Sequence, residues 1–161
     1  MFRLNIDYSK QIMDWYAETV YVLKLLKLLT EKDGTQDNLY IEPLAKLSAL
    51  IDRGRFIFPN IDKKDDFGKK KPLAFRGYRN VALDFLVASY SIYNNPQNRK
   101  KRIAQAEELS RFFSSIVFDV VRPTDNLRQI KKITDKYFVK EEIFEDFIKN
   151  EDSKILMSMW E

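Results

Sequence analysis

Apolar or semi-polar residues between positions 12 and 29 recur at alternating steps of three and four, and this spacing constrains the fold more than any other feature of the sequence. The repeat falls at positions 12, 15, 19, 22, 26 and 29, which lie on one face of a helix. Four further apolar residues widen that face: Val20, Leu23, Leu25 and Leu28. We therefore expect a long helix that packs against neighbours on two sides and ends at Asp33–Gly34.

The remainder of the chain also has mostly helical patterns. Helices are predicted over residues 37–53, 79–93, 96–121, 124–136, 140–150 and 151–160. In the 37–53 segment, Pro43 suits a first turn and Gly54 suits the position just past the helix end. The stretch "RFIFPN" (55–60) is expected to be extended, and the non-periodic residues 60–78 are expected to form a long loop.

These patterns predict an all-α protein. Its 161 residues suit one domain, and a hydrophobic content of 45% with 14% aromatic residues provides a sufficient core. We expect a single helical domain over residues 1–161, an irregular bundle of about five to seven helices with one long basic loop at about 56–78.

The sequence contains no Cys and no His. This composition excludes disulfides, zinc sites of the Cys/His type and nucleophiles that depend on a histidine base. An enzyme built from this chain would depend on Asp, Glu, Lys, Tyr or a hard metal. Catalysis is therefore not the expected function, and no catalytic residue, cofactor or metal site is assigned; a metal-dependent hydrolase ranks third among the functions considered.

No segment of the sequence favours a membrane location. The most apolar stretch, residues 12–29, contains Asp14, Glu18, Lys24 and Lys27, which argues against a bilayer span. Its wide apolar face is better explained by core burial than by contact with a membrane surface. Because a chain without cysteine has no disulfide framework to support secretion, we expect a cytoplasmic protein.

Charge is unevenly distributed along the chain. Residues 53–80 carry nine Lys or Arg against three Asp, whereas residues 141–161 carry seven acids against two Lys. A basic middle of this kind attracts negative groups, which can belong to a partner or to the chain itself.

Two Arg-Gly units occupy the basic middle, "DRGR" (52–55) and "FRGYR" (75–79). Planar guanidinium groups suit carboxylate or phosphate, and glycine lets a backbone approach closely. The candidate anion-binding residues of this region are Arg53, Arg55, Lys69, Lys70, Lys71, Arg76 and Arg79. Either the four arginines converge on an external anion, or acids of the chain brace them, with Asp52 and Asp84 as the candidates.

A second basic element, "NRKKR" (98–102), is expected in the first turn of the 96–121 helix. It adds Arg99, Lys100, Lys101 and Arg102 to the candidate anion-binding residues. Cations are unfavourable at the positive end of a helix dipole, and the residues that follow are not acidic. A distant acidic segment, an external anion or plain solvation would each explain the cluster.

The stretch "ILMSMW" (155–160) carries Met157, Met159 and Trp160. A docked terminal helix would explain these residues. They are also candidate partner-binding residues, since Met and Trp suit adaptable contacts.

The stretches "LSALIDRGRFIFPN" (47–60) and "KKPLAFRGYRNVALDFLVASY" (70–90) resemble a group of small bacterial helical proteins of unknown activity. The similarity covers roughly residues 10–125. Many members of that group have an N-terminal membrane anchor, which we expect to be absent before Ser9. The resemblance implies no activity and no site residue.

From these observations we expect a cytoplasmic, non-catalytic interaction module that binds a protein partner or a second copy of itself. The alternative is sequence-independent binding to nucleic-acid backbone or another polyanion through residues 53–80 and 99–102.

Overall fold

The structure, a computed structural model, describes residues 6–33 and 36–134. The helices in these ranges are α1 (Ile6–Asp33), α2 (Ile41–Ile57), α3 (Val81–Tyr93), α4 (Ile103–Val121) and α5 (Leu127–Thr134). Three short 3-10 helices, η1 (Asp37–Tyr40), η2 (Leu73–Phe75) and η3 (Pro123–Asn126), lie between them. The all-α class is confirmed, while the helices predicted over 140–150 and 151–160 lie outside the described residues.

The chain forms two compact units, residues 1–121 and 122–161. The first unit contains α1 to α4. The described part of the second contains η3 and α5, so the predicted 124–136 helix is divided in two. Arg128 and Lys132 of α5 are exposed. The single domain expected over residues 1–161 stays a prediction.

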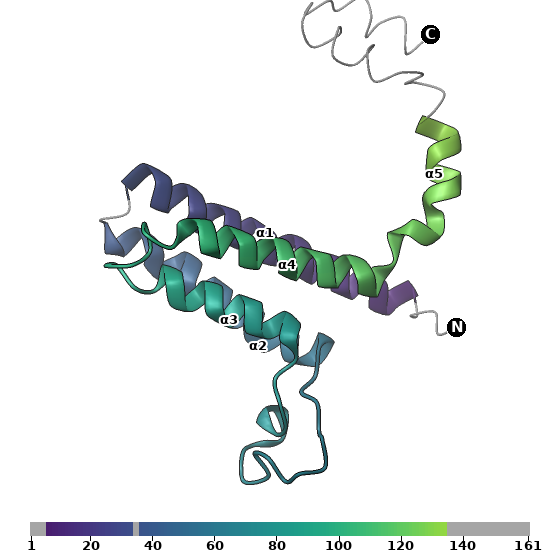
Figure 1. The fold of residues 1–161 in the computed structure, drawn as a ribbon, viewed down its shortest axis with the longest axis horizontal. Coiled ribbons are helices and arrows are strands. Elements are labelled where there is room, and N and C mark those ends of the chain that lie inside the picture. The colour runs from purple at the N-terminus through teal and green to yellow at the C-terminus, as the bar shows by residue number, and fades with distance from the viewer. Residues whose placement is uncertain (1–5, 34–35, 135–161) are drawn as a thin grey trace, which may run out of the picture. The chain divides into compact units, whose positions relative to one another are not determined.

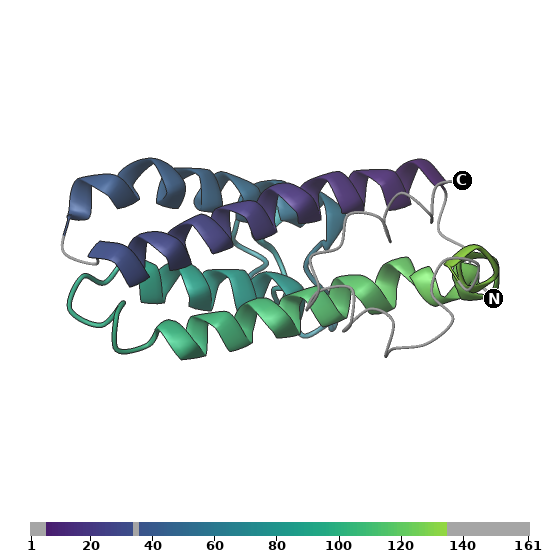
Figure 2. The same cartoon turned by 90° about the horizontal axis from the view of Figure 1, so that it is seen from above.

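Helices α1 to α4 form an up-down-up-down bundle (Figures 1 and 2). Helix α1 packs against α2 and α4, and α3 packs against the same two helices. All consecutive helices of the bundle are antiparallel. Short connections favour this arrangement for α1–α2 and α3–α4, whereas α2 and α3 are joined by a long connection. That long connection, residues 58–80, is called the loop below, and the bundle end from which it leaves is called the loop end.

The apolar seam predicted in residues 12–29 is the core face of α1. Ile12, Trp15, Thr19, Val22 and Leu26 are all buried. Of the four residues expected to widen this face, Leu23 is buried, Val20 and Leu25 are partly buried, and Leu28 is exposed. The helix therefore faces two neighbours, as its spacing indicates, but its apolar face is narrower than predicted on the Leu28 side.

Trp15 is the centre of the bundle core. Its indole Nε1 donates to the backbone oxygen of Leu50 at 2.8 Å. Its ring meets Phe113 of α4 edge-on, with centroids 5.4 Å apart, and Phe58 at 5.7 Å. One side chain of α1 thus contacts α2, α4 and the start of the loop, and its only polar atom is satisfied.

The sequence predicted that Gly54 lies just past the end of the second helix, but the structure places it inside α2. Helix α2 continues through it to Ile57, so "RFIFPN" begins in helix instead of being extended throughout. A Cβ at position 54 would lie 2.5 Å from Leu83 Cδ2 and 2.7 Å from Trp15 Cζ2. Glycine is needed here because three helices meet at this point, not because the chain must turn.

The starts of α3 and α4 also differ from the sequence prediction. Helix α3 begins at Val81, because the Asn80 side chain accepts a hydrogen bond from the Ala82 amide at 3.1 Å and caps it. Helix α4 begins at Ile103, so the "NRKKR" cluster precedes the helix. The Asn95 side chain accepts from the Gln97 amide at 3.1 Å, a local turn that competes with regular helix.

We predict that Gly54→Ala destabilises the bundle by about 1–3 kcal/mol, because the added methyl group overpacks a fully buried contact. Helix propensity alone would favour alanine, so the sign of the change separates packing from propensity. Urea unfolding of the variant measures it. Ser48→Ala, at an exposed position of α2, is the control and should change the unfolding free energy by less than about 0.5 kcal/mol.

Candidate functional site

The loop projects from the bundle between α2 and α3 (Figure 1). Its two arms are joined by an antiparallel backbone bridge, in which Ile61 N donates to Tyr78 O at 2.7 Å and Tyr78 N donates to Ile61 O at 2.9 Å. Gly77 has a φ of 74°, and a Cβ there would lie 2.6 Å from Ile61 O. The bridge therefore requires the glycine of the second Arg-Gly unit.

A stacked ring pair holds the outer part of the loop. Phe67 and Tyr78 stack with centroids 4.4 Å apart. The Tyr78 hydroxyl donates to Asp65 Oδ2 at 2.6 Å, and the Phe67 amide donates to Asp65 Oδ1 at 3.2 Å. The Tyr78 hydrogen bond lowers the pKa of Asp65 and raises the pKa of Tyr78. The loop is therefore held by its own contacts although most of it lies outside the core.

A cleft of about 570 Å³ lies between the loop and the adjacent ends of α2 and α3. Its wall includes Arg55, Asn60, Lys71, Phe75, Arg79 and Asp84. The Arg55 side chain is 11% exposed, and its guanidinium lies 4.4 Å from the centre of the Phe75 ring. The buried Asn60 Oδ1 has no hydrogen-bond partner among the described residues. The cleft therefore combines cations, rings and an unpaired acceptor.

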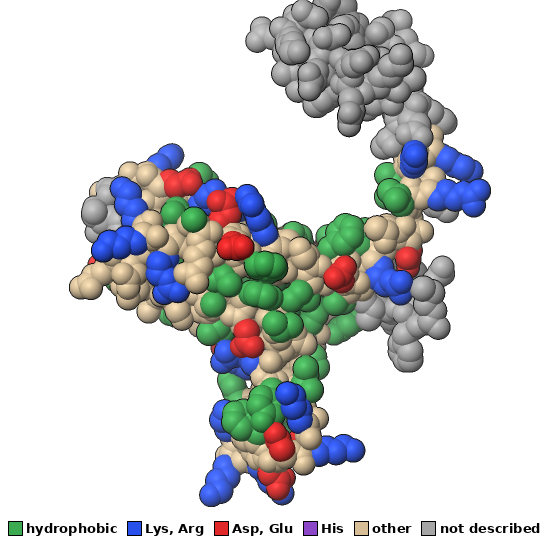
Figure 3. Space-filling model, in the orientation of Figure 1, with side chains coloured by type: hydrophobic (Ala, Val, Ile, Leu, Met, Phe, Trp, Pro, Cys, Tyr) green, Lys and Arg blue, Asp and Glu red, His purple; other side chains and the backbone are tan. Residues whose placement is uncertain are grey.

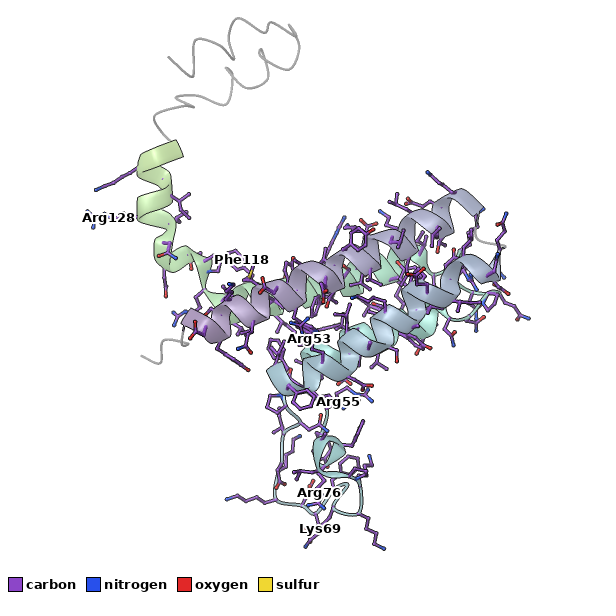
Figure 4. The ribbon with its side chains drawn as sticks, turned by 180° about the vertical axis from the view of Figure 1, so that it is seen from behind. Arg53, Arg55, Lys69, Arg76, Phe118 and Arg128 are labelled. Atoms are coloured by element: carbon purple, nitrogen blue, oxygen red, sulfur yellow. The ribbon has the colours of Figure 1, made fainter. Side chains whose placement is uncertain are left out.

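The four arginines of the Arg-Gly units do not converge. Arg55 and Arg79 line the cleft. Arg53 pairs with Glu18 of α1 at 3.0 Å, and Arg76 donates to the Lys71 backbone oxygen at 3.0 Å (Figure 4). Arg53 and Arg55 are two positions apart on α2, and side chains at that spacing leave a helix in different directions. Of the two alternatives, the convergence of all four arginines on one anion therefore has no support in this arrangement.

Besides the Arg53–Glu18 pair, acids of the chain contact three more of the candidate cations in this region. Arg55 Nε lies 3.3 Å from Asp52, Arg79 lies 3.0 Å from Asp84, and Lys69 lies 3.1 Å from Asp66. At least one member of each pair is substantially exposed, so each pair contributes only about 0–1 kcal/mol. These contacts orient the side chains more than they stabilise the fold.

The second basic element lies at the opposite end of the bundle from the loop, beside η1 (Figure 1). Arg99 is buried and pairs with Asp37 at 2.7 Å. Arg102 donates to the side-chain oxygen of Gln105 at 2.8 Å, and Lys100 and Lys101 are exposed. Residues 53–80 and 99–102 therefore do not form one continuous basic surface.

Large apolar side chains gather at the loop end. Phe56 is 81% exposed and Leu73 is 80% exposed. Four others there are exposed to a smaller degree: Ile61, Phe67, Phe75 and Val81. Figure 3 shows apolar side chains on the loop beside Lys and Arg side chains. We refer to these six residues as the loop-end apolar patch.

This patch was not expected from the sequence, although one signal was present. Phe56 does not fit the spacing of the buried α2 residues, which include Leu47, Leu50, Gly54 and Ile57. An apolar residue outside the core spacing of its helix points to solvent. The residues that were predicted to bind a partner, Met157, Met159 and Trp160, lie outside the described residues.

Within residues 6–33 and 36–134, no group of three or more acidic side chains is placed to hold a metal ion. None of the helices described there is both long enough and apolar enough to cross a membrane. No family model matches the chain, and the search found no similar curated protein and no similar solved structure. The resemblance to a group of small bacterial helical proteins therefore stays a prediction.

We predict that Tyr78→Phe raises the pKa of Asp65 towards its ordinary value, because the variant removes the largest cause of the lowered pKa. Because folding lowers the pKa of Asp65, the Asp65 carboxylate stabilises the folded loop at pH values above the pKa that this group has in the unfolded chain. That contribution is lost as pH falls through the folded pKa. In the variant, the loop should therefore lose this acid-sensitive contribution to its ordering.

An NMR titration of the Asp65 carboxyl carbon measures this pKa directly. Tyr21→Phe removes a hydroxyl from an exposed residue of α1 and should leave the Asp65 titration unchanged. An unchanged Asp65 pKa in Tyr78→Phe would show that the hydrogen bond does not hold the loop in solution.

Proposed function

We propose that this protein is a cytoplasmic, non-catalytic interaction module that binds a protein partner through the loop end of its bundle. The observation that carries the proposal is the loop-end apolar patch, which exposes large side chains on a backbone already held in one conformation. Exposed apolar patches with a polar rim are typical of protein interaction sites.

The internal contacts of the loop support binding without large rearrangement. The Ile61–Tyr78 bridge, the Phe67–Tyr78 stack and the Asp65 hydrogen bonds fix the loop before a partner arrives. A surface that is already ordered loses less conformational entropy on binding. The cations around the cleft would then act as the polar rim that orients the partner.

Binding to nucleic acid or another polyanion is the weaker reading of the same residues. Arg53, Arg55 and Arg79 each contact an acid of the chain, so a phosphate would have to compete with a carboxylate. The remaining basic cluster lies at the other end of the bundle. A polyanion would therefore not contact residues 53–80 and 99–102 across one face.

We predict that the double variant Phe56→Ser, Leu73→Ser loses partner binding by about tenfold or more, since exposed aromatic and large apolar side chains are common binding hot spots. The measurement is a quantitative pull-down with purified protein as bait, together with sedimentation velocity to detect self-association. Both side chains are exposed, so the variant should fold normally.

Ile41→Ser is the matched control, because Ile41 is also a strongly exposed large apolar residue (69%) but lies at the opposite end of the bundle from the loop. It should retain binding. Equal binding by the double variant and the wild-type protein would refute the proposal. Tight binding to mixed RNA or DNA that weakens steeply with salt, with no protein partner and no self-association, would favour the polyanion alternative instead.

A further inference from the structure

The end of the bundle opposite the loop contains a second cleft, which has a volume of about 430 Å³. It lies where η1 and the start of α2 meet the connection between α3 and α4. Its apolar wall includes Tyr40, Ile41, Leu44, Tyr90 and Pro96. Clefts of this size with mostly apolar walls and a few polar groups are typical small-molecule sites.

Arg99 supplies the charged group of this cleft. Its side chain is 2% exposed, and its Cζ lies 3.7 Å from the centre of the Tyr40 ring. Tyr40 is itself held in place, since its hydroxyl forms a 2.9 Å hydrogen bond with the buried Thr30 hydroxyl. The guanidinium therefore occupies a fixed position against a fixed ring.

The hydrogen bonding of Arg99 is incomplete. Its Nη2 donates to Asp37 Oδ1 at 2.7 Å, whereas the buried Nε and Nη1 have no partner among the described residues. Buried guanidinium N–H groups without acceptors are unfavourable, and such unpaired groups call for an explanation in each structure. Only one oxygen of the Asp37 carboxylate accepts a hydrogen bond from Arg99, although a guanidinium group can donate to both oxygens of a carboxylate.

Asp37 is suited to give way to a second carboxylate. Its side chain is 64% exposed and belongs to the four-residue helix η1, so it can turn back into water. The adjacent Lys100, Lys101 and Arg102 keep the surroundings of Arg99 positive when Asp37 leaves. The exchange would also bring acceptors to guanidinium nitrogens that Asp37 does not reach.

We propose that this cleft binds a small organic acid, with the carboxylate on Arg99 in place of Asp37 and an apolar body against Ile41, Leu44 and Tyr90. The apolar wall excludes a bare inorganic anion as the best ligand, because such an anion would leave that wall uncovered. This inference is independent of the loop end and of the function proposed for it.

Proton–nitrogen NMR of the wild-type protein tests the proposal, with 4-phenylbutyrate as the probe. The Nε–H signal of Arg99 should shift and saturate as the probe is added at millimolar concentration. The neutral amide of the same acid keeps the body and a carbonyl acceptor but lacks the charge. It should bind about tenfold more weakly, as should inorganic phosphate.

A variant that leaves Arg99 intact locates the site. Ala45 is exposed on α2 and lines the cleft, so Ala45→Leu should fill the space for the apolar body and abolish the Arg99 shift. Ala49→Leu, at an exposed position one turn further along α2, is the matched control and should retain the shift. Both substitutions keep a good helix former, so both proteins should fold.

Four outcomes would overturn the proposal. The first is no saturable Arg99 shift with 4-phenylbutyrate. The second is equal binding of the amide, which would remove the role of charge, and the third is equal binding of phosphate, which would remove the role of the apolar wall. The fourth is unchanged binding in Ala45→Leu, which would place the ligand outside the cleft.

Discussion

The fit of Trp15 against Gly54 is the contact on which the bundle depends. The indole lies where α1, α2 and α3 meet, and any side chain at position 54 would overlap it or Leu83. Trp15 also contacts Phe113 of α4, and the indole N–H of Trp15 donates a hydrogen bond to the backbone oxygen of Leu50. A large ring opposite a missing side chain fixes the depth and rotation of several helices at once, because close-packed interiors tolerate few other arrangements.

This contact also places the loop. Gly54 lies in the last turn of α2, and Phe58 packs on Trp15 as the chain leaves the helix, so the direction in which the loop departs is set by the core. Beyond that point the loop is ordered by local contacts, chiefly the Ile61–Tyr78 bridge and the Phe67–Tyr78 stack. Because the loop lies outside the core, some of its aromatic rings are exposed at the surface. Two of them, Phe67 and Phe75, belong to the loop-end apolar patch.

The two ends of the bundle differ in how they treat arginine. At the loop end, Arg79 remains partly exposed beside Asp84, where water screens the pair and leaves the guanidinium accessible. At the other end, Arg99 is removed from water against Tyr40 and has a single acid partner. Arginine thus contributes to the polar rim of a surface at one end and is a buried, incompletely paired charge at the other. The difference arises from burial, because a buried guanidinium loses its hydrogen bonds to water and needs protein or ligand acceptors instead.

The sequence by itself determined the all-α class, the core face of α1 and approximate positions for α1 to α4, because these follow from a helical period read over many residues. It also drew attention to Gly54, Gly77 and Arg99, but two of the assignments were wrong: Gly54 was expected just past the end of a helix, and Arg99 was expected in the first turn of one. Only the tertiary structure decided that Gly54 accommodates a ring, that Arg53 and Arg55 separate, and that the two basic segments lie at opposite ends. Each of these depends on residues distant in sequence that meet in space, and local spacing contains no information on such meetings.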